Sequence, residues 1–242
     1  MWALFRKEVN EFFSSLIGYI VIIVFLSASG IFLWILPGTN ILEFGYATVE
    51  ELFELAPWVF MFLIPAITMR SLAEETRSGT IELLTTKPLT AFQLILAKYL
   101  AGMVLVLFSI LPTLLYLLTV YQLAEPQGNV DLGATAGAYL GLIFLGSAYV
   151  GIGLFASSLA DNQILAFIAG LFICFLFYAL LEWGRQLTNG DLLDDILEGI
   201  NIQAHYLSIR RGVIDTYDLV YFVSLTLLFL LLTKTRMESR LW

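Results

Sequence analysis

The sequence contains a single cysteine, Cys174, and a single histidine, His205, among its 242 residues. One cysteine cannot form a disulfide within the chain, and zinc sites built from cysteine and histidine need at least three ligands. The long apolar runs of the chain also lack paired carboxylates. No acid–base or metal constellation is therefore expected, and the chain is not predicted to be an enzyme.

The phosphate-binding pattern G-x-x-x-x-G-K-[ST] occurs nowhere in the chain. Its glycine-rich backbone and lysine are what hold the phosphates of ATP in nucleotide-binding loops. We therefore expect this chain to bind no cofactor itself. ATP hydrolysis, if it drives the protein, must come from another polypeptide.

Charged residues are scarce, at 13% of the chain, whereas 60% of the residues are hydrophobic. This is more apolar surface than a soluble domain of the same size can bury. A membrane-spanning helix needs ~20 apolar residues. Uncharged runs of this length lie at 16–36, 99–121, 132–160 and 162–181, and shorter ones that need flanking residues lie at 55–69 and 219–233.

The chain is therefore predicted to be an all-α integral membrane protein with one transmembrane domain, residues 1–242. Alternating ~10-residue strands, the pattern of an outer-membrane barrel, are absent from the sequence. The six spans are predicted at about 16–36, 54–73, 94–121, 134–158, 163–182 and 216–234.

The first fifteen residues, 1–15, are predicted to form an amphipathic helix on the membrane surface. Apolar residues such as Trp2, Phe5 and Val9 recur at helical spacing, while charged residues including Lys7 and Glu8 take the opposite face. This helix leads directly into the first span.

Basic residues are distributed unevenly between the two sides of the predicted membrane domain. Only Arg185, Arg210 and Arg211 fall on one side, and all other lysines and arginines fall on the side of the termini. The positive-inside rule therefore predicts that the N- and C-termini are cytoplasmic. The net charge of −8 then belongs to the outer loops and indicates no nucleic-acid partner.

The loop at 74–93, between the second and third spans, has strong helix-stopping and helix-starting signals. Gly79 can adopt a positive φ and end the second helix, and Pro88 interrupts the following segment. Thr90 and Gln93 have the spacing of a capping box that starts the third helix. A short helix at about 80–84 would expose apolar side chains that either the membrane surface or a soluble partner must cover.

Residues 74–89, E-E-T-R-S-G-T-I-E-L-L-T-T-K-P-L, resemble the E-x-x-x-G-T-x-E-x-L-x-x-x-P signature of ABC-2 type transporter permeases. Residues 157–166, S-S-L-A-D-N-Q-I-L-A, are similar to the polar turn between spans four and five of that family. The resemblance implies an ABC-2 (type V exporter-like) permease fold in the bacterial cytoplasmic (inner) membrane.

The same resemblance implies which residues meet the partner. In the family, the first signature forms the coupling helix that touches an ABC ATPase, the subunit that holds ATP and Mg. The second membrane half would be a related permease, an accessory membrane subunit or the same chain as a homodimer. The residues implied for ATPase coupling are Glu74, Glu75, Gly79, Thr80, Ile81, Glu82, Leu83, Leu84 and Pro88, and those implied for the cytoplasmic turn are Asp161 and Gln163.

Three glycines, Gly133, Gly137 and Gly141, are spaced by four at the start of the fourth span. Small residues at this spacing allow two helices to approach closely. The contact predicted here is either packing within the chain or an interface between two membrane subunits.

A narrower likeness links residues 1–13, 56–70 and 74–89 to the gliding-motility-associated permeases of the GldF type. It implies a role in gliding motility or in associated export. The alternatives are an exporter of another substrate and, from other classes, a non-transporting scaffold or a secondary transporter. The four uncharged runs lack the carboxylates that would mark an ion path, which counts against a secondary transporter.

Overall fold

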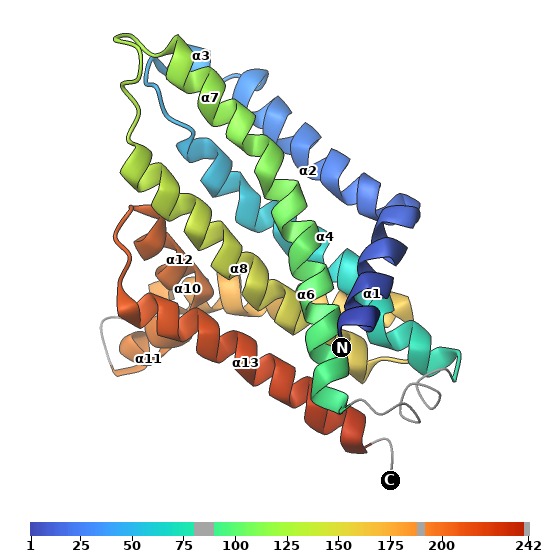
Figure 1. Ribbon diagram of the computed structural model, residues 1–242. Helices are drawn as coiled ribbons and strands as arrows, with labels where there is room; N and C mark the ends of the chain where they lie inside the picture. Colours follow the sequence, from blue (N-terminus) through green and yellow to red (C-terminus); the bar gives the residue numbers. More distant parts are fainter. Residues whose placement is uncertain (80–89, 188–191, 240–242) are drawn as a thin grey trace.

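The computed structural model describes residues 1–79, 90–187 and 192–239, and every regular element in these ranges is a helix. Within these ranges, six helical segments are long and apolar enough to cross a membrane, which confirms the predicted all-α fold with six spans. Figure 1 shows them as one bundle. The six segments are Leu16–Trp34, Glu50–Arg77, Ala91–Leu123, Leu132–Leu159, Gln163–Arg185 and Thr216–Ser239.

Four of these spans are single helices, and two are composite. The single helices are α2 (Leu16–Trp34), α4 (Glu50–Arg77), α8 (Leu132–Leu159) and α13 (Thr216–Ser239). The third span consists of α6 (Ala91–Ile110), a 3₁₀ turn (Leu111–Thr113) and α7 (Leu114–Leu123), and the fifth consists of α9 (Gln163–Phe175), a π-helical stretch (Leu176–Leu180) and α10 (Leu181–Leu187). The shorter helices are α1 (Trp2–Ser14), α3 (Ile41–Phe44), α11 (Leu192–Ile200) and α12 (Ile202–Arg210).

The breaks inside the two composite spans have different causes. The 3₁₀ turn of the third span contains Pro112, which lacks an N–H and cannot continue the regular helical ladder. The π-helical stretch at Leu176–Leu180 contains no proline or glycine. Such stretches fit one extra residue into a turn, and composition does not predict them.

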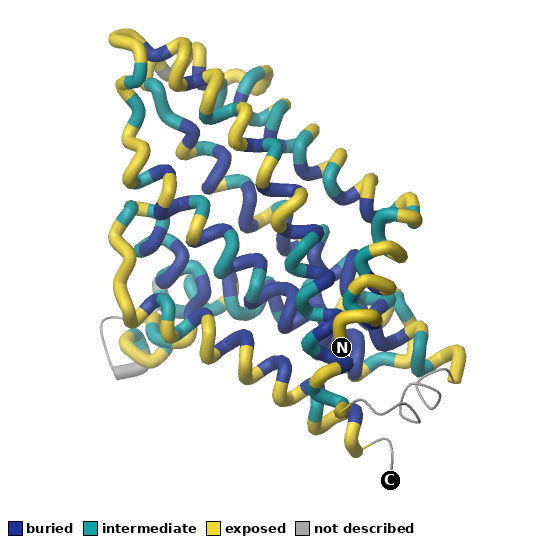
Figure 2. The backbone as a smooth tube through the Cα atoms, in the orientation of Figure 1, coloured by how far each residue is buried: buried dark blue, intermediate teal, exposed yellow. Residues whose placement is uncertain are grey.

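Helix α8 lies at the centre of the bundle and contacts α4, α6, α9, α12 and α13. Its side chains Leu142, Leu145 and Ile152 are completely buried. Helix α2, in contrast, lies at the edge of the bundle and is exposed along much of its length (Figure 2). Its exposed side chains include Ile20 and Ile23. Large apolar side chains exposed along a spanning helix are what contact with lipid tails requires.

The bundle has two distinct ends (Figure 1). One holds the beginning of α1, the end of α4, the beginning of α6 and the end of α13, and is referred to below as the termini end. The other, the far end, holds α3, the tip of α7 and α12. At the termini end α1 packs against α6 and α2.

Candidate functional site

The two helix ends that flank the predicted coupling segment have the local structure that the sequence indicates. Gly79 has a φ of +68°, and its N–H donates to the Thr76 carbonyl at 3.2 Å, immediately after α4 ends. At the start of α6, Gln93 N–H donates to Thr90 Oγ1 at 3.3 Å, and Thr90 N–H donates to Gln93 Oε1 at 3.2 Å. The positive φ and the capping box are both confirmed.

The segment between these helix ends contains most of the residues implied for ATPase coupling. Of that set, Glu74, Glu75 and Gly79 lie in the described part of the chain. Glu74 is exposed and pairs with Arg70 at 3.3 Å. The remaining members, Thr80, Ile81, Glu82, Leu83, Leu84 and Pro88, lie outside the described residues.

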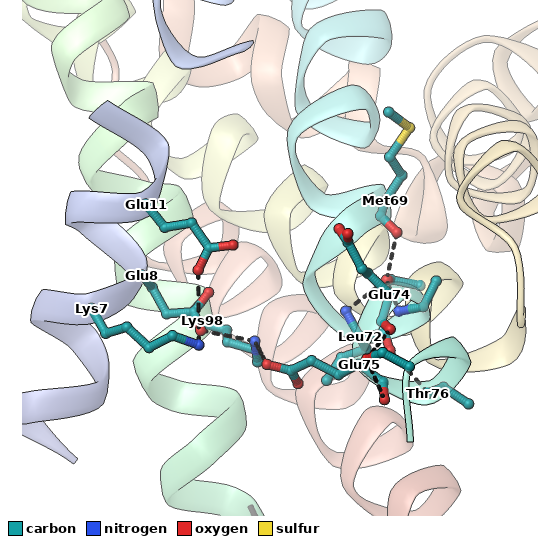
Figure 3. Close-up of polar contacts among 12 residues, drawn as sticks. Lys7, Glu8, Glu11, Met69, Leu72, Glu74, Glu75, Thr76 and Lys98 are labelled. Atoms are coloured by element: carbon teal, nitrogen blue, oxygen red, sulfur yellow. Dashed lines mark hydrogen bonds and ion pairs between the residues drawn. The ribbon is translucent and has the colours of Figure 1, made fainter. Parts of the chain in front are cut away.

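A buried ion-pair network joins the three helices at this end (Figure 3). Lys98 Nζ on α6 lies 2.7 Å from Glu75 Oε1 on α4 and 3.0 Å from Glu8 Oε1 on α1. The Lys98 side chain is 2% exposed, and those of Glu8 and Glu75 are 7% and 14% exposed. We refer to Glu8, Glu75 and Lys98 as the Lys98 clamp.

The Lys98 clamp lies next to the predicted coupling segment. Glu75 lies four residues before Gly79, and Lys98 lies in the second turn of α6, so the clamp bridges the two helices just beyond the loop that joins them. A buried charge without its partner is strongly unfavourable, so the three side chains hold together or separate together. The clamp therefore connects the end of α4, the beginning of α6 and α1 to one another.

The structure corrects the predicted arrangement of the first helix. Glu8 does not lie on the solvent-facing side with Lys7 and Glu11 but is buried with Leu4, one turn earlier on the same face. The reason is the ion pair with Lys98, which compensates the cost of burying the carboxylate. The sequence analysis counted Lys98 only among the basic residues on the side of the termini, although its apolar neighbours in L-I-L-A-K-Y-L-A were a signal of burial.

A second contact fixes α8 to the same part of α4. The N–H groups of Leu72 and Ala73 both donate to Ser157 Oγ at 3.0 Å, and Ser157 donates to the Met69 carbonyl at 3.0 Å. Ser157 is completely buried. The Ser157 hydroxyl thus makes all its hydrogen bonds to the α4 backbone about one turn before Glu75, and these bonds connect α8 to the end of α4 without any charged group.

Ser157→Ala is expected to destabilise the protein by about 1–2 kcal/mol, because buried backbone groups of α4 lose a hydrogen-bond partner. The adjacent Ser158 provides a matched control, since it is also buried but bonds only the Phe155 carbonyl of its own helix. The thermal midpoints of both alanine variants in detergent check this. Equal losses for the two variants would contradict a structural role for the α8–α4 contact.

The polar turn between α8 and α9 contains both residues implied by the second family signature. Asp161 lies in the turn, and Gln163 is the first residue of α9. The helix cap is neither of these but Asn162, whose side chain accepts from Ile164 N–H at 3.0 Å. The start of α9 is therefore fixed by a local asparagine cap, and Asp161 is exposed.

Two of the three spaced glycines pack against α12 of the same chain. A Cβ on Gly137 would lie 2.7 Å from Gly212 Cα, and a Cβ on Gly141 would lie 3.4 Å from side-chain atoms of Ile209 and Tyr206. Gly133 is exposed, and in the described part of the chain no other helix lies within 4 Å of a Cβ built on it. The close approach is thus internal for Gly137 and Gly141, and Gly133 does not take part.

Polar contacts at the far end hold α12 against α4. Tyr206 donates to the Phe53 carbonyl at 2.7 Å, and burial raises the pKa of Tyr206 well above its usual value, so the hydroxyl keeps the proton it donates. Arg210 lies 3.1 Å from Glu50 and 2.9 Å from Glu54. Sequence reasoning did not identify these contacts, because they join residues far apart in the chain.

These features define the class of the protein as a multi-pass helical membrane protein. Its second and third spans are joined at the termini end by the ion pair between Glu75 and Lys98, and the third span begins there with a capping box. The family model for ABC-2 family transporter proteins matches residues 2–236. The match covers nearly the whole chain, and the chain therefore belongs to the ABC-2 transporter family. A search of curated proteins finds no match to the sequence.

Proposed function

We propose that this chain is the membrane-spanning permease subunit of an ABC-2 transporter and receives motion from a separate ABC ATPase at residues 74–93. The ATPase would supply the bound ATP and Mg. The observation that carries the proposal is the Lys98 clamp, because it ties the two helices leaving this segment to each other and to α1.

The mechanism follows from the rigidity of these connections. Closure of the ATPase pair on ATP would displace the segment after Gly79, on the side that the basic residues mark as cytoplasmic. Helices α4 and α6 would move as one unit because Glu75 and Lys98 join them. Ser157 would pass the displacement to α8, the centre of the bundle. The displacement would then shift the balance between two packed arrangements of the spans.

The complete transporter would contain two membrane halves, formed by this chain with itself or with a related permease. For the biological role we propose gliding motility or associated export, in the bacterial inner membrane. The support for that role is the likeness of residues 1–13, 56–70 and 74–89 to the gliding-motility-associated permeases.

The partner claim is tested by purifying the detergent-solubilised protein from its native cells and identifying what co-purifies by mass spectrometry. The wild type is expected to retain an ABC ATPase, and a Glu82→Arg/Leu84→Asp variant is expected to lose it, because the substitutions place charge on the predicted contact. A matched Lys234→Glu/Glu238→Lys variant, which inverts an exposed pair at the end of α13, should retain the ATPase.

Two results would count against the proposal. If a well-folded wild-type protein brings down no ATPase, the permease role fails, and the scaffold and secondary-transporter alternatives take its place. If the ATPase is retained equally by the Glu82→Arg/Leu84→Asp variant, the contact lies elsewhere. Gliding-motility components among the co-purifying proteins would support the narrower role, and components of an unrelated export system would contradict it.

A further inference from the structure

A cavity of about 480 Å³ lies at the termini end, between α1, α4 and the beginning of α6. The Lys98 clamp forms its inner wall. Figure 3 shows Lys7, Glu8 and Glu11 on α1 facing Glu74 and Glu75 on α4, with Lys98 between the two helices. The cavity is therefore bounded by charged side chains from three separate helices, α1, α4 and α6.

The wall also has an apolar part, formed by Phe12, Ile17 and Ile67. Phe12 and Ile17 lie on either side of Ser15, where amphipathic helix α1 ends and spanning helix α2 begins. The chain passes at this point from the membrane surface into the hydrocarbon region. The cavity thus lies at the depth of phospholipid headgroups, with charged and apolar walls next to each other.

The charges available to a ligand are balanced. Lys7 pairs with Glu11 at 3.8 Å on α1, and Arg70 pairs with Glu74 at 3.3 Å on α4. The side chains of both pairs are between 38% and 64% exposed, and exposed pairs of this kind exchange partners at little cost. In the Lys98 clamp one ammonium pairs with two carboxylates in a buried network, so the clamp adds no net positive charge to the cavity.

We propose that this cavity binds the headgroup of one phospholipid that carries both a phosphate and a primary ammonium group, as phosphatidylethanolamine does. Arg70 and Lys7 would hold the phosphate, and Glu74 and Glu11 would accept hydrogen bonds from the ammonium. The apolar wall at Phe12, Ile17 and Ile67 would receive the upper part of the acyl chains.

Charge complementarity distinguishes this headgroup from the other common ones. An anionic headgroup would pair with the two cations but leave Glu11 and Glu74 facing its phosphate. A quaternary ammonium cannot donate hydrogen bonds to these carboxylates and is held instead by aromatic faces, of which the described lining offers Phe12 alone. A headgroup with both charges and N–H donors satisfies all four side chains of the rim.

The test uses the full-length protein reconstituted in vesicles that contain equal amounts of phosphatidylethanolamine, phosphatidylcholine and phosphatidylglycerol with identical acyl chains. After gentle extraction, native mass spectrometry measures which lipid stays bound. The wild type is expected to retain phosphatidylethanolamine preferentially. Arg70→Gln/Glu74→Gln is expected to lower that preference by about tenfold, since two of the four charged contacts are removed.

A matched control is available on α13. Lys234 and Glu238 have the same spacing as Arg70 and Glu74 and the same side-chain exposures, 38% and 48%, but do not line the cavity. Lys234→Gln/Glu238→Gln should retain the wild-type preference. If the α4 variant does not fold, Lys7→Gln/Glu11→Gln on α1 tests the opposite side of the same rim.

The proposal is overturned if the wild type retains the three lipids equally or prefers phosphatidylglycerol or phosphatidylcholine. It is also overturned if the preference for phosphatidylethanolamine survives the rim substitutions unchanged. Because the measurement needs no ATPase and no ATP, its result is independent of the function proposed above.

Discussion

Replacing Lys98 with methionine is expected to destabilise the protein by about 3–5 kcal/mol, because two buried carboxylates lose their common partner. Glu8 and Glu75 both pair with Lys98 Nζ, and the lysine side chain is 2% exposed. Methionine keeps most of the volume, so the loss measures charge rather than packing. The thermal midpoint in detergent, followed by tryptophan fluorescence, gives the change.

Lys234→Met is the control for this substitution. Lys234 also pairs with a glutamate, Glu238, but at 3.7 Å and with a side chain that is 38% exposed. Exposed pairs contribute at most about 1 kcal/mol, so little change is expected. Equal midpoints for the Lys98→Met and Lys234→Met variants would mean that the clamp does not hold the three helices together.

A variant that replaces the entire clamp with apolar side chains separates stability from coupling. Glu8→Leu/Glu75→Met/Lys98→Met leaves no buried charge in the network, and such replacements are often neutral or stabilising. We therefore expect this variant to recover most of the stability that Lys98→Met loses. If the clamp passes motion from the ATPase, the associated ATPase should still hydrolyse ATP more slowly with the triple variant than with the wild-type permease.

Features of the fold that depend on short stretches of sequence were predictable. The six spans follow from long apolar runs, and the ends around Gly79 and Thr90 follow from backbone and capping chemistry within a few residues. These interactions are local, so the sequence pattern contains all of the participants. The coupling roles of residues 80–84 and Pro88 remain predictions.

The Lys98 clamp could not be predicted in the same way. Its partners are separated in sequence by 23 and 90 residues, and each belongs to a different helix. A helical pattern assigns a charged residue such as Glu8 to the solvent-facing side because its charge is costly to bury alone. Only the fold shows that a lysine lies opposite it and removes that cost.

The role of the spaced glycines of α8 could be predicted only in part. Their spacing predicts that a helix approaches closely, but it does not say whether the neighbour belongs to the same chain. The structure places Gly212, which has a φ of +82°, and Ile209 against Gly137. The neighbour is therefore the end of α12 and the turn after it, two elements that precede the last span.

Gly137→Ala is expected to destabilise the protein by about 1–3 kcal/mol through overpacking. Its new Cβ would lie 2.7 Å from Gly212 Cα and 3.0 Å from the Ile209 carbonyl oxygen, and both are backbone atoms that cannot rotate away. Helix α12 would have to move away from α8, which also strains the bond from Tyr206 to the Phe53 carbonyl. Thermal midpoints in detergent measure the loss.

Alanine substitutions at the other two glycines are expected to cost progressively less stability than Gly137→Ala. Gly141→Ala should cost less than Gly137→Ala, because its nearest neighbours at 3.4 Å are side-chain atoms of Ile209 and Tyr206 that can shift. Gly133→Ala should be neutral or stabilising by up to ~1 kcal/mol, since alanine favours the helix and no described residue of another helix lies within 4 Å of the new Cβ. If the three glycines instead join two permease subunits, substitution of the exposed Gly133 should have the largest effect. Gly133→Ala should then dissociate a dimer, which size-exclusion chromatography would detect. Packing against α12 requires that the loss of stability decreases in the order Gly137→Ala, Gly141→Ala, Gly133→Ala. It also requires that the elution volume of all three variants stays unchanged.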